Sequence, residues 1–164
     1  MTLRMLTVGA LAAGFLAVGA AHAQQQSPAA SPPAYGAPVT TEQAKKAVAA
    51  ALAEGKTRLV FAVVDPSGNL VYFEKMDGAP YASSEIAIRK ARTSATFKRP
   101  SMAFFEQMEG GHNYVMTLSP ELIASGGGLP LVVDGRIVGA IGVSGSPSGL
   151  LDQTAAEAAV NALK

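Results

Sequence analysis

The chain has 164 residues, 13 basic and 12 acidic side chains, and no cysteine. A formal net charge of +1 argues against a protein that binds nucleic acid by neutralising its phosphates. The lack of cysteine excludes disulfides and thiolate metal sites, and the length fits one ordinary domain.

Residues 1–23 have the pattern of a secretory signal peptide. Arg4 supplies the positive end, residues 6–20 form an apolar run, and residues 21–23 read Ala-His-Ala, a cleavage signal. The run is too short and too rich in small residues for a good membrane span, with a retained N-terminal anchor as the alternative. Removal of Arg4 from the 13 basic side chains leaves 12, equal to the 12 acidic ones. We expect a periplasmic or secreted protein with no membrane span after cleavage.

Residues 24–39 are of low complexity, with prolines, alanines and glutamines and almost no large apolar side chain. Such a segment buries too little surface to offset its ordering entropy. We expect a disordered spacer here and a single domain over residues 40–164.

The first half of this domain predicts a helix, a hairpin and a second helix. Thr40 and Gln43 have the spacing of a capping box that opens a helix, which Gly55 ends. Strands at residues 59–65 and 70–76 flank a Pro-Ser-Gly-Asn turn. Serines cap the next helix, residues 84–97. Its small side chains would let it lie close on a sheet: Ala87, Ala91, Ser94 and Ala95.

The second half predicts a short helix at residues 101–109 and an irregular segment at 112–128, with a short strand at 115–118. Strands at residues 129–133 and 136–144 flank an Asp-Gly turn, and an alanine-rich helix spans residues 150–163. Hairpins in place of strand-helix-strand units predict an antiparallel sheet with helices packed on it, an α+β domain.

The glycine-rich stretch from Gly126 to Gly149 has the wrong spacing for nucleotide binding. Gly139, Gly142 and Gly145 recur every three residues, and the first two lie inside an expected strand. A dinucleotide motif needs G-x-G-x-x-G between a strand and a helix, and a P-loop needs a lysine that is absent here. The stretch also lacks the G-x-S-x-G elbow of hydrolases. We expect these glycines to build the hairpin and the floor of a pocket.

Three stretches together resemble the GlcG/HbpS family of haem-binding proteins, also found as the C-terminal domain of some corrinoid adenosyltransferases. They are "VVDPSGNLVYFEKMDGAPYASSEIAIRKARTSATF", "GGGLPLVVDGRIVGAIGVSG" and the following Asp152. The resemblance implies a profilin-like fold, a central antiparallel sheet flanked by helices, and often a ring-like or octameric assembly. It ties secreted members to haem binding and to haem or redox sensing with a sensor-protein partner. Other members occur near organic-acid metabolism.

His112 is the only histidine that remains after signal cleavage, and we expect it to be the axial ligand of a haem iron. An exposed loop histidine without a role is the alternative. Tyr114 and Met116 are alternative iron ligands, although core packing is the favoured interpretation for both. Glu106 and Glu109 could form a carboxylate metal site with His112, but a solvated polar face is favoured.

The expected cofactor-binding residues also include Lys90 and Arg92, as partners of the haem propionates, and Gly127 and Gly128 in the glycine-lined floor. A solvated basic face is the alternative for the two cations. Within the same helix, Glu85 is expected to pair with Arg89. We expect Asp152 to serve the start of the last helix.

The same basic helix and Gly-Gly-Leu-Pro turn would also suit a module that binds or senses a small organic acid. A small enzyme that acts on such a molecule or degrades haem is the least favoured alternative, because acid and base groups are scarce. The apolar composition, 49 % hydrophobic residues, predicts a homo-oligomer.

Overall fold

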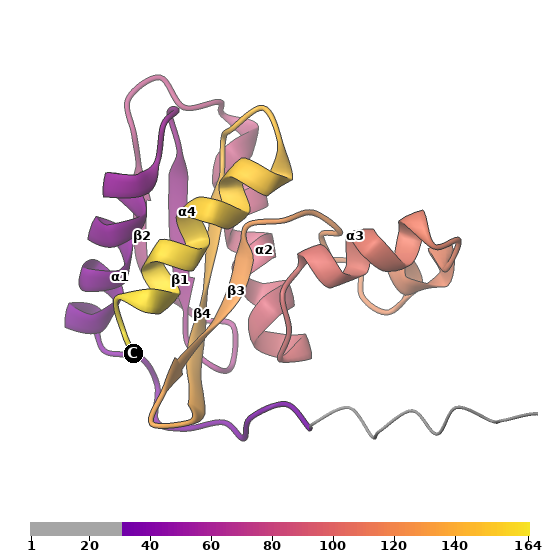
Figure 1. The fold of residues 1–164 in the computed structure, drawn as a ribbon, viewed down its shortest axis with the longest axis horizontal. Coiled ribbons are helices and arrows are strands. Elements are labelled where there is room, and N and C mark those ends of the chain that lie inside the picture. The colour runs from indigo at the N-terminus through magenta and orange to yellow at the C-terminus, as the bar shows by residue number, and fades with distance from the viewer. Residues whose placement is uncertain (1–30) are drawn as a thin grey trace, which may run out of the picture. The chain divides into compact units, whose positions relative to one another are not determined.

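The computed structural model describes residues 31–164, so the expected signal peptide at residues 1–23 lies outside the described residues. The described residues form one four-stranded antiparallel sheet with the strand order β2-β1-β4-β3 and helices on both faces (Figure 1). This arrangement confirms the predicted α+β, profilin-like fold. The elements are α1 (Thr41–Glu54), β1 (Val60–Val64), β2 (Leu70–Lys75), α2 (Ala82–Phe97), α3 (Met102–Glu109), the 3₁₀ helix η1 (Asn113–Thr117), β3 (Gly128–Val133), β4 (Arg136–Ser144) and α4 (Gly149–Asn161).

The two predicted hairpins form the two halves of the sheet. β1 pairs with β2, β3 pairs with β4, and β1 joins the halves by pairing with β4 from Val60↔Ser144 to Val64↔Ala140. α1 begins with the predicted capping box, in which Thr40 and Gln43 exchange hydrogen bonds, and Gly55 follows its last residue. Local sequence signals therefore set both hairpins and the first helix.

The sheet face covered by α1 and α4 holds the larger core. Side chains of Phe61, Leu131 and Ile141 are fully buried there against alanines of the two helices. On the opposite face, α2 packs against β1, β3 and β4. Burial on both faces explains why β1 is an uninterrupted apolar run.

α2 lies very close to the sheet, as its small side chains predict. Ala87 and Ala91 are fully buried, and a side chain on Gly142 would collide with the Ala87 carbonyl oxygen. The expectation of serine caps is wrong, because α2 begins at Ala82 without a side-chain cap. The N–H of Ser83 instead donates to the carbonyl of Pro80.

Residues 34–39 are ordered, in contrast to the disorder expected for the whole spacer. The Tyr35 backbone forms a parallel bridge with Ile137, and Val39 donates from its N–H to the carbonyl of Val138 at 2.7 Å. The Tyr35 hydroxyl donates to the Ala95 carbonyl at 2.7 Å, and Val39 is only 4 % exposed. These two larger side chains anchor a segment whose average composition resembles a linker.

α3 and η1 form a lobe that projects from the side of the sheet (Figure 1). Its small core consists of Phe104, Val115 and Leu122, with Phe97 packed edge-to-face on Phe104. The predicted strand at residues 115–118 is wrong, because residues 113–117 form a 3₁₀ helix in which only Val115 is buried.

Candidate functional site

The candidate site is an apolar groove of about 240 Å³ between α3, the loop before β3 and the beginning of α4. Two depressions of larger volume, along residues 36–43 and along β3 and α4, are more open to solvent. The groove is slightly below the usual size range of ligand pockets, so it suits part of a flat or elongated ligand. Its lining residues are Met102, Phe105, Ser125, Gly126, Ser148, Gly149 and Leu150.

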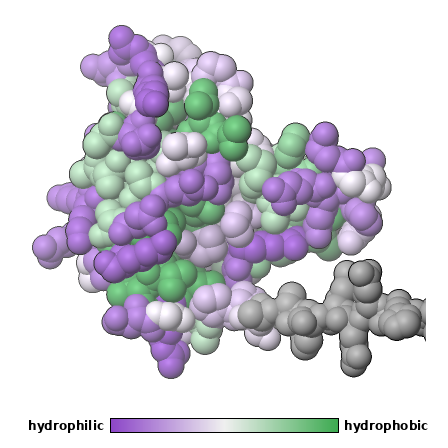
Figure 2. All heavy atoms as spheres, viewed as in Figure 1, coloured by the Kyte–Doolittle hydropathy of each residue, from purple (hydrophilic) through white to green (hydrophobic). Residues whose placement is uncertain are grey.

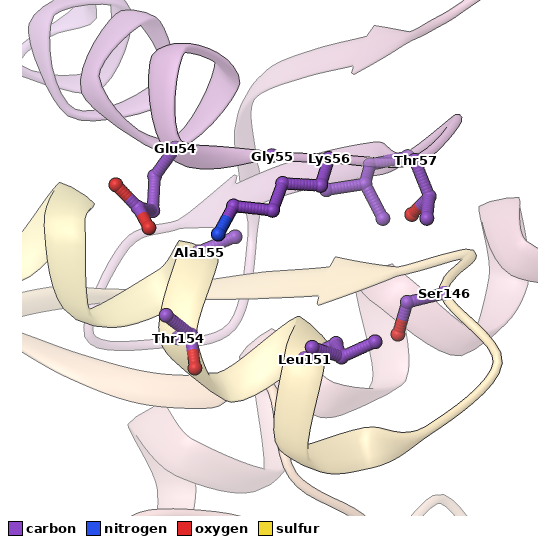
Figure 3. Close-up of a pocket in the computed structure, with 9 residues that line it drawn as sticks. Glu54, Gly55, Lys56, Thr57, Ser146, Leu151, Thr154 and Ala155 are labelled. Carbon is purple, nitrogen blue, oxygen red and sulfur yellow. The ribbon is translucent and has the colours of Figure 1, made fainter.

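A second cleft, between the end of α1 and α4, is much smaller. Figure 3 shows Glu54 and Lys56 on one side of it and Leu151, Thr154 and Ala155 on the other. Its volume is about 50 Å³, enough for a few water molecules and too small for an organic cofactor. We therefore take the apolar groove as the candidate site.

Glycines allow the loop before β3 and the beginning of α4 to lie in close contact at the groove. A side chain on Gly126 would collide with the Gly149 carbonyl oxygen and with the end of the Met102 side chain. At the rim, Phe105 is 43 % exposed and Leu150 is 66 % exposed. Figure 2 shows hydrophobic atoms at the surface over the beginning of α4. The groove thus opens onto an apolar rim.

A buried ion pair connects α2 to the beginning of α4. Lys90 and Asp152 are 2 % and 3 % exposed, and Lys90 Nζ lies 2.7 Å from Asp152 Oδ2. Nζ also donates to the Val143 carbonyl at 3.0 Å, and Asp152 Oδ1 accepts from the Ser146 N–H at 3.0 Å. Burial lowers the pKa of Lys90 below its usual 10.5, and the contact with Asp152 opposes that shift.

This pair changes the interpretation of two predicted residues. Lys90 does not reach solvent and already donates to Asp152, so its geometry does not support the expected contact with a propionate. Asp152 lies in the first turn of α4, as expected, but the sequence analysis did not identify its partner. A cation buried in a core of small residues takes a carboxylate partner because an unpaired charge there is costly.

Gly127 and Gly128 are buried by the protein itself. The Gly127 N–H donates to Gln153 Oε1 at 2.9 Å, and the Gly128 N–H donates to Ser101 Oγ at 2.9 Å. A side chain on Gly127 would lie 3.2 Å from Lys90 Nζ. Gly127 and Gly128 permit close packing behind the groove. The glycine that lines the groove from this loop is Gly126.

The other cations of α2 also contact protein oxygens. Arg92 Nε donates to the Gly68 carbonyl at 3.2 Å, and its Nη1 lies 3.8 Å from a Glu121 carboxylate oxygen. Arg89 donates to the carbonyls of Pro120 and Glu121, so the predicted pairing of Arg89 with Glu85 is wrong. Arg92 keeps 37 % of its side chain exposed. The basic helix therefore gives little support to the organic-acid alternative.

His112 lies in the exposed loop between α3 and η1. No hydrogen bond or ion pair links its imidazole to another residue between 31 and 164, and its ring lies edge-to-face with Tyr114, 6.2 Å between centroids. Tyr114 is 61 % exposed and Met116 is 40 % exposed, so core packing is the wrong interpretation for both. Three side chains able to bind haem iron thus reach solvent in one short segment.

The predicted site residues do not converge within one chain. Lys90 lies behind the groove, Arg92 contacts a different loop, and His112 lies beyond the far end of α3. Among residues 31–164 no cluster of three or more His, Cys, Asp and Glu side chains could hold a metal, so Glu106 and Glu109 do not form one with His112. None of the helices in this part of the chain is both long and apolar enough to span a bilayer.

Sequence reasoning missed the apolar walls of the groove. Met102 and Phe105 are three residues apart on α3, the spacing that places two side chains on one helix face. Leu150 is the second residue of α4, directly after a Ser-Pro-Ser-Gly stretch, where an apolar residue has few neighbours to cover it. Both signals were available in the sequence.

Comparison with curated proteins gives relatives in Citrobacter freundii and Escherichia coli. The chain is 33 % identical over 115 residues to an uncharacterized 15.0 kDa protein from the dhaT-dhaS intergenic region of Citrobacter freundii, covering 66 % of this chain and 81 % of that protein. It is 39 % identical over 83 residues to protein GlcG of Escherichia coli K12, covering 51 % of this chain and 61 % of GlcG.

Solved structures show the same fold. A double mutant of HbpS from Streptomyces reticuli aligns with a TM-score of 0.72 at 31 % identity, over 84 % of this chain and 99 % of that chain. A crystal structure of a PduOC–haem complex aligns with a TM-score of 0.70 at 25 % identity, over 77 % of this chain and 96 % of PduOC. Residues 39–161 match the family model described as haem degrading protein HbpS-like. The chain therefore belongs to the HbpS-like family.

Proposed function

We propose that this protein is an exported haem-binding protein that handles haem or takes part in haem or redox sensing. The observation that carries the proposal is its similarity to PduOC, which was crystallised as a haem complex, at 25 % identity over 77 % of this chain. Membership of the HbpS-like family supports the same function. The apolar groove and the exposed segment around His112 give the proposal a location.

The residues present fit a haem group. Imidazole, phenol and thioether groups all bind haem iron, and His112, Tyr114 and Met116 present all three at the surface. The groove walls of Met102, Phe105 and Leu150 suit the apolar edge of a porphyrin. α3 connects the two features, and its eight residues span about 12 Å.

Each part of the site has a distinct role in this proposal. His112 would hold the iron, because its imidazole is exposed and makes no hydrogen bond to another residue between 31 and 164. The groove excludes water from the apolar edge of the ring. Arg92 is the candidate partner for a propionate, since 37 % of its side chain is exposed, whereas Lys90 is buried. The bound iron would supply redox chemistry.

Export, assembly and a sensor partner are further parts of the proposal. The pattern of residues 1–23 supports export, and intact-mass measurement of periplasmic protein should show a chain that begins at Gln24. Exposed Phe105, Leu150 and Leu151 support a homo-oligomer whose interface covers the open side of the groove. Light scattering that shows only monomers at working concentration would contradict the assembly.

Haemin titration of the purified apo-protein tests haem binding. We expect a saturable Soret shift at one haemin per subunit, lost or changed in His112→Ala and retained in Asn113→Ala, which changes the exposed neighbour at the start of η1. A saturable shift that is unchanged in His112→Ala would support haem binding and indicate Tyr114 or Met116 as the iron ligand. Absence of a saturable shift in the unsubstituted protein would overturn the proposed function.

A further inference from the structure

The Lys90–Asp152 pair joins three chain segments that are distant in sequence. Lys90 Nζ donates to the Val143 carbonyl at the end of β4 and to the Asp152 carboxylate in α4. Asp152 also accepts from the Ser146 N–H, in the loop between those elements. Gly127 packs directly against both charged side chains, and its carbonyl accepts from the Val143 N–H at 2.8 Å.

The same segments form the floor and one wall of the apolar groove. Ser125 and Gly126 directly precede Gly127, and residues 148–150 lie between Ser146 and Asp152. A side chain on Gly149 would lie 2.9 Å from the Gly126 backbone nitrogen, so these loops are in contact across the groove. The ion pair and the groove lining are therefore held by the same two loops.

We propose that Lys90 and Asp152 are positioning residues for the groove: their buried ion pair fixes the loops at residues 125–128 and 145–149 in the conformation that receives the ligand. The part of this inference that concerns haem rests on the proposed function. The part that concerns the two loops does not, because it follows from hydrogen bonds within the protein itself.

The direction of its hydrogen bonds explains why an ion pair, and not a pair of apolar side chains, would occupy positions 90 and 152. Apolar side chains of similar volume often stabilise a fold as well as a buried pair does, but they do not specify where a carbonyl or an N–H must lie. Lys90 and Asp152 together fix one carbonyl and one N–H, those of Val143 and Ser146. Replacing both charges by apolar groups should thus keep the fold and release the loops.

The test compares the double variant Lys90→Met/Asp152→Leu with the unsubstituted protein. Ser94→Ala is the matched control, because Ser94 lies one turn from Lys90 on α2, is fully buried, and its hydroxyl has no hydrogen-bond partner among residues 31–164. Urea unfolding first establishes that each variant folds with near-normal stability. Should the double variant fail to fold, Asp152→Asn would be measured in its place, because the amide keeps an oxygen near Lys90 Nζ and removes only the carboxylate charge.

Two readouts follow on folded protein. In hydrogen exchange of the ligand-free protein, amides of residues 125–128 and 145–149 should exchange roughly tenfold faster in the double variant, while β1 amides keep their protection. In haemin titration, the dissociation constant should rise roughly tenfold and the Soret band should shift, with Ser94→Ala unchanged. Unchanged loop exchange together with unchanged haemin affinity in the folded double variant would overturn the positioning role.

The two readouts separate this inference from the proposed function. If the loops exchange faster in the double variant but the unsubstituted protein does not bind haemin, the positioning of the loops is supported and haem is refuted as the ligand. If loop exchange in the double variant is normal and the unsubstituted protein binds haemin, haem binding is supported and the positioning role is refuted. Faster loop exchange with unchanged haemin affinity would place the haem site elsewhere than the groove.

Discussion

Lys90→Met should be one of the most destabilising single substitutions in the domain. The change removes both hydrogen bonds from Lys90 Nζ and leaves the Asp152 carboxylate, 3 % exposed, with only the Ser146 N–H as a described partner. Breaking a buried pair from one side costs about 3–5 kcal/mol. That cost is a large part of the 5–15 kcal/mol by which domains are typically stable.

Urea unfolding followed by circular dichroism measures this cost. With a usual slope of about 1–3 kcal/mol per molar urea, the midpoint should fall by roughly 2 M in Lys90→Met. The double variant Lys90→Met/Asp152→Leu should recover most of the loss, because no unpaired charge remains buried. A cost below about 1 kcal/mol for Lys90→Met, or additive costs of the two substitutions, would refute the view that the pair is tightly coupled.

Three further substitutions test the packing and the turns. Gly142→Ala should cost about 1–3 kcal/mol in urea unfolding because the new methyl group meets the Ala87 carbonyl, and a neutral result would show that α2 can move away. Tyr35→Phe should cost about 0.5–1.5 kcal/mol by the same assay through loss of the bond to Ala95, and no loss would mean that residues 34–39 add nothing to stability. For Asp65, burial acts to raise the pKa, but bonds from the first hairpin turn outweigh it and hold the pKa below 3.8. The contribution of Asp65 to the free energy of unfolding is thus present above pH 3.8 and lost as pH falls through the pKa of the folded state. Asp65→Asn should therefore reduce the loss of stability between about pH 5 and about pH 2. An unchanged dependence of stability on pH would contradict this.

The sequence was sufficient to predict the sheet because its signals are local. The Asp-Gly turn at residues 134–135 and the turn at 66–69 join apolar runs, and both hairpins form as expected. The strand prediction at residues 115–118 failed because the apolar residues there have neither strand alternation nor a sheet edge to join, and only Val115 is buried. The other side chains there remain exposed, which local patterning alone did not indicate.

The order of residues 34–39 depends on contacts that no local pattern contains. The Tyr35 hydroxyl bonds to a carbonyl 60 residues later, and the backbone bonds of this segment are made by the start of β4. A composition average over a proline-rich segment hides two anchoring residues, Tyr35 and Val39. A spacer prediction from composition is therefore safest where no aromatic or β-branched residue interrupts the polar run.

The burial of Lys90 was within reach of the sequence. Ala87, Ala91 and Ser94 were predicted to face the sheet, and Lys90 lies three residues after the first and four before the last, on the same face of a 3.6-residue helix. A lysine on a face of small residues must be buried, and a buried ammonium needs a carboxylate partner. Asp152, in the first turn of an otherwise alanine-rich helix, was the natural candidate. The periodicity of α2 therefore predicts where the charge lies. The partner and the groove could not be predicted, because only the fold brings the beginning of α4 against α2, 62 residues earlier in the chain.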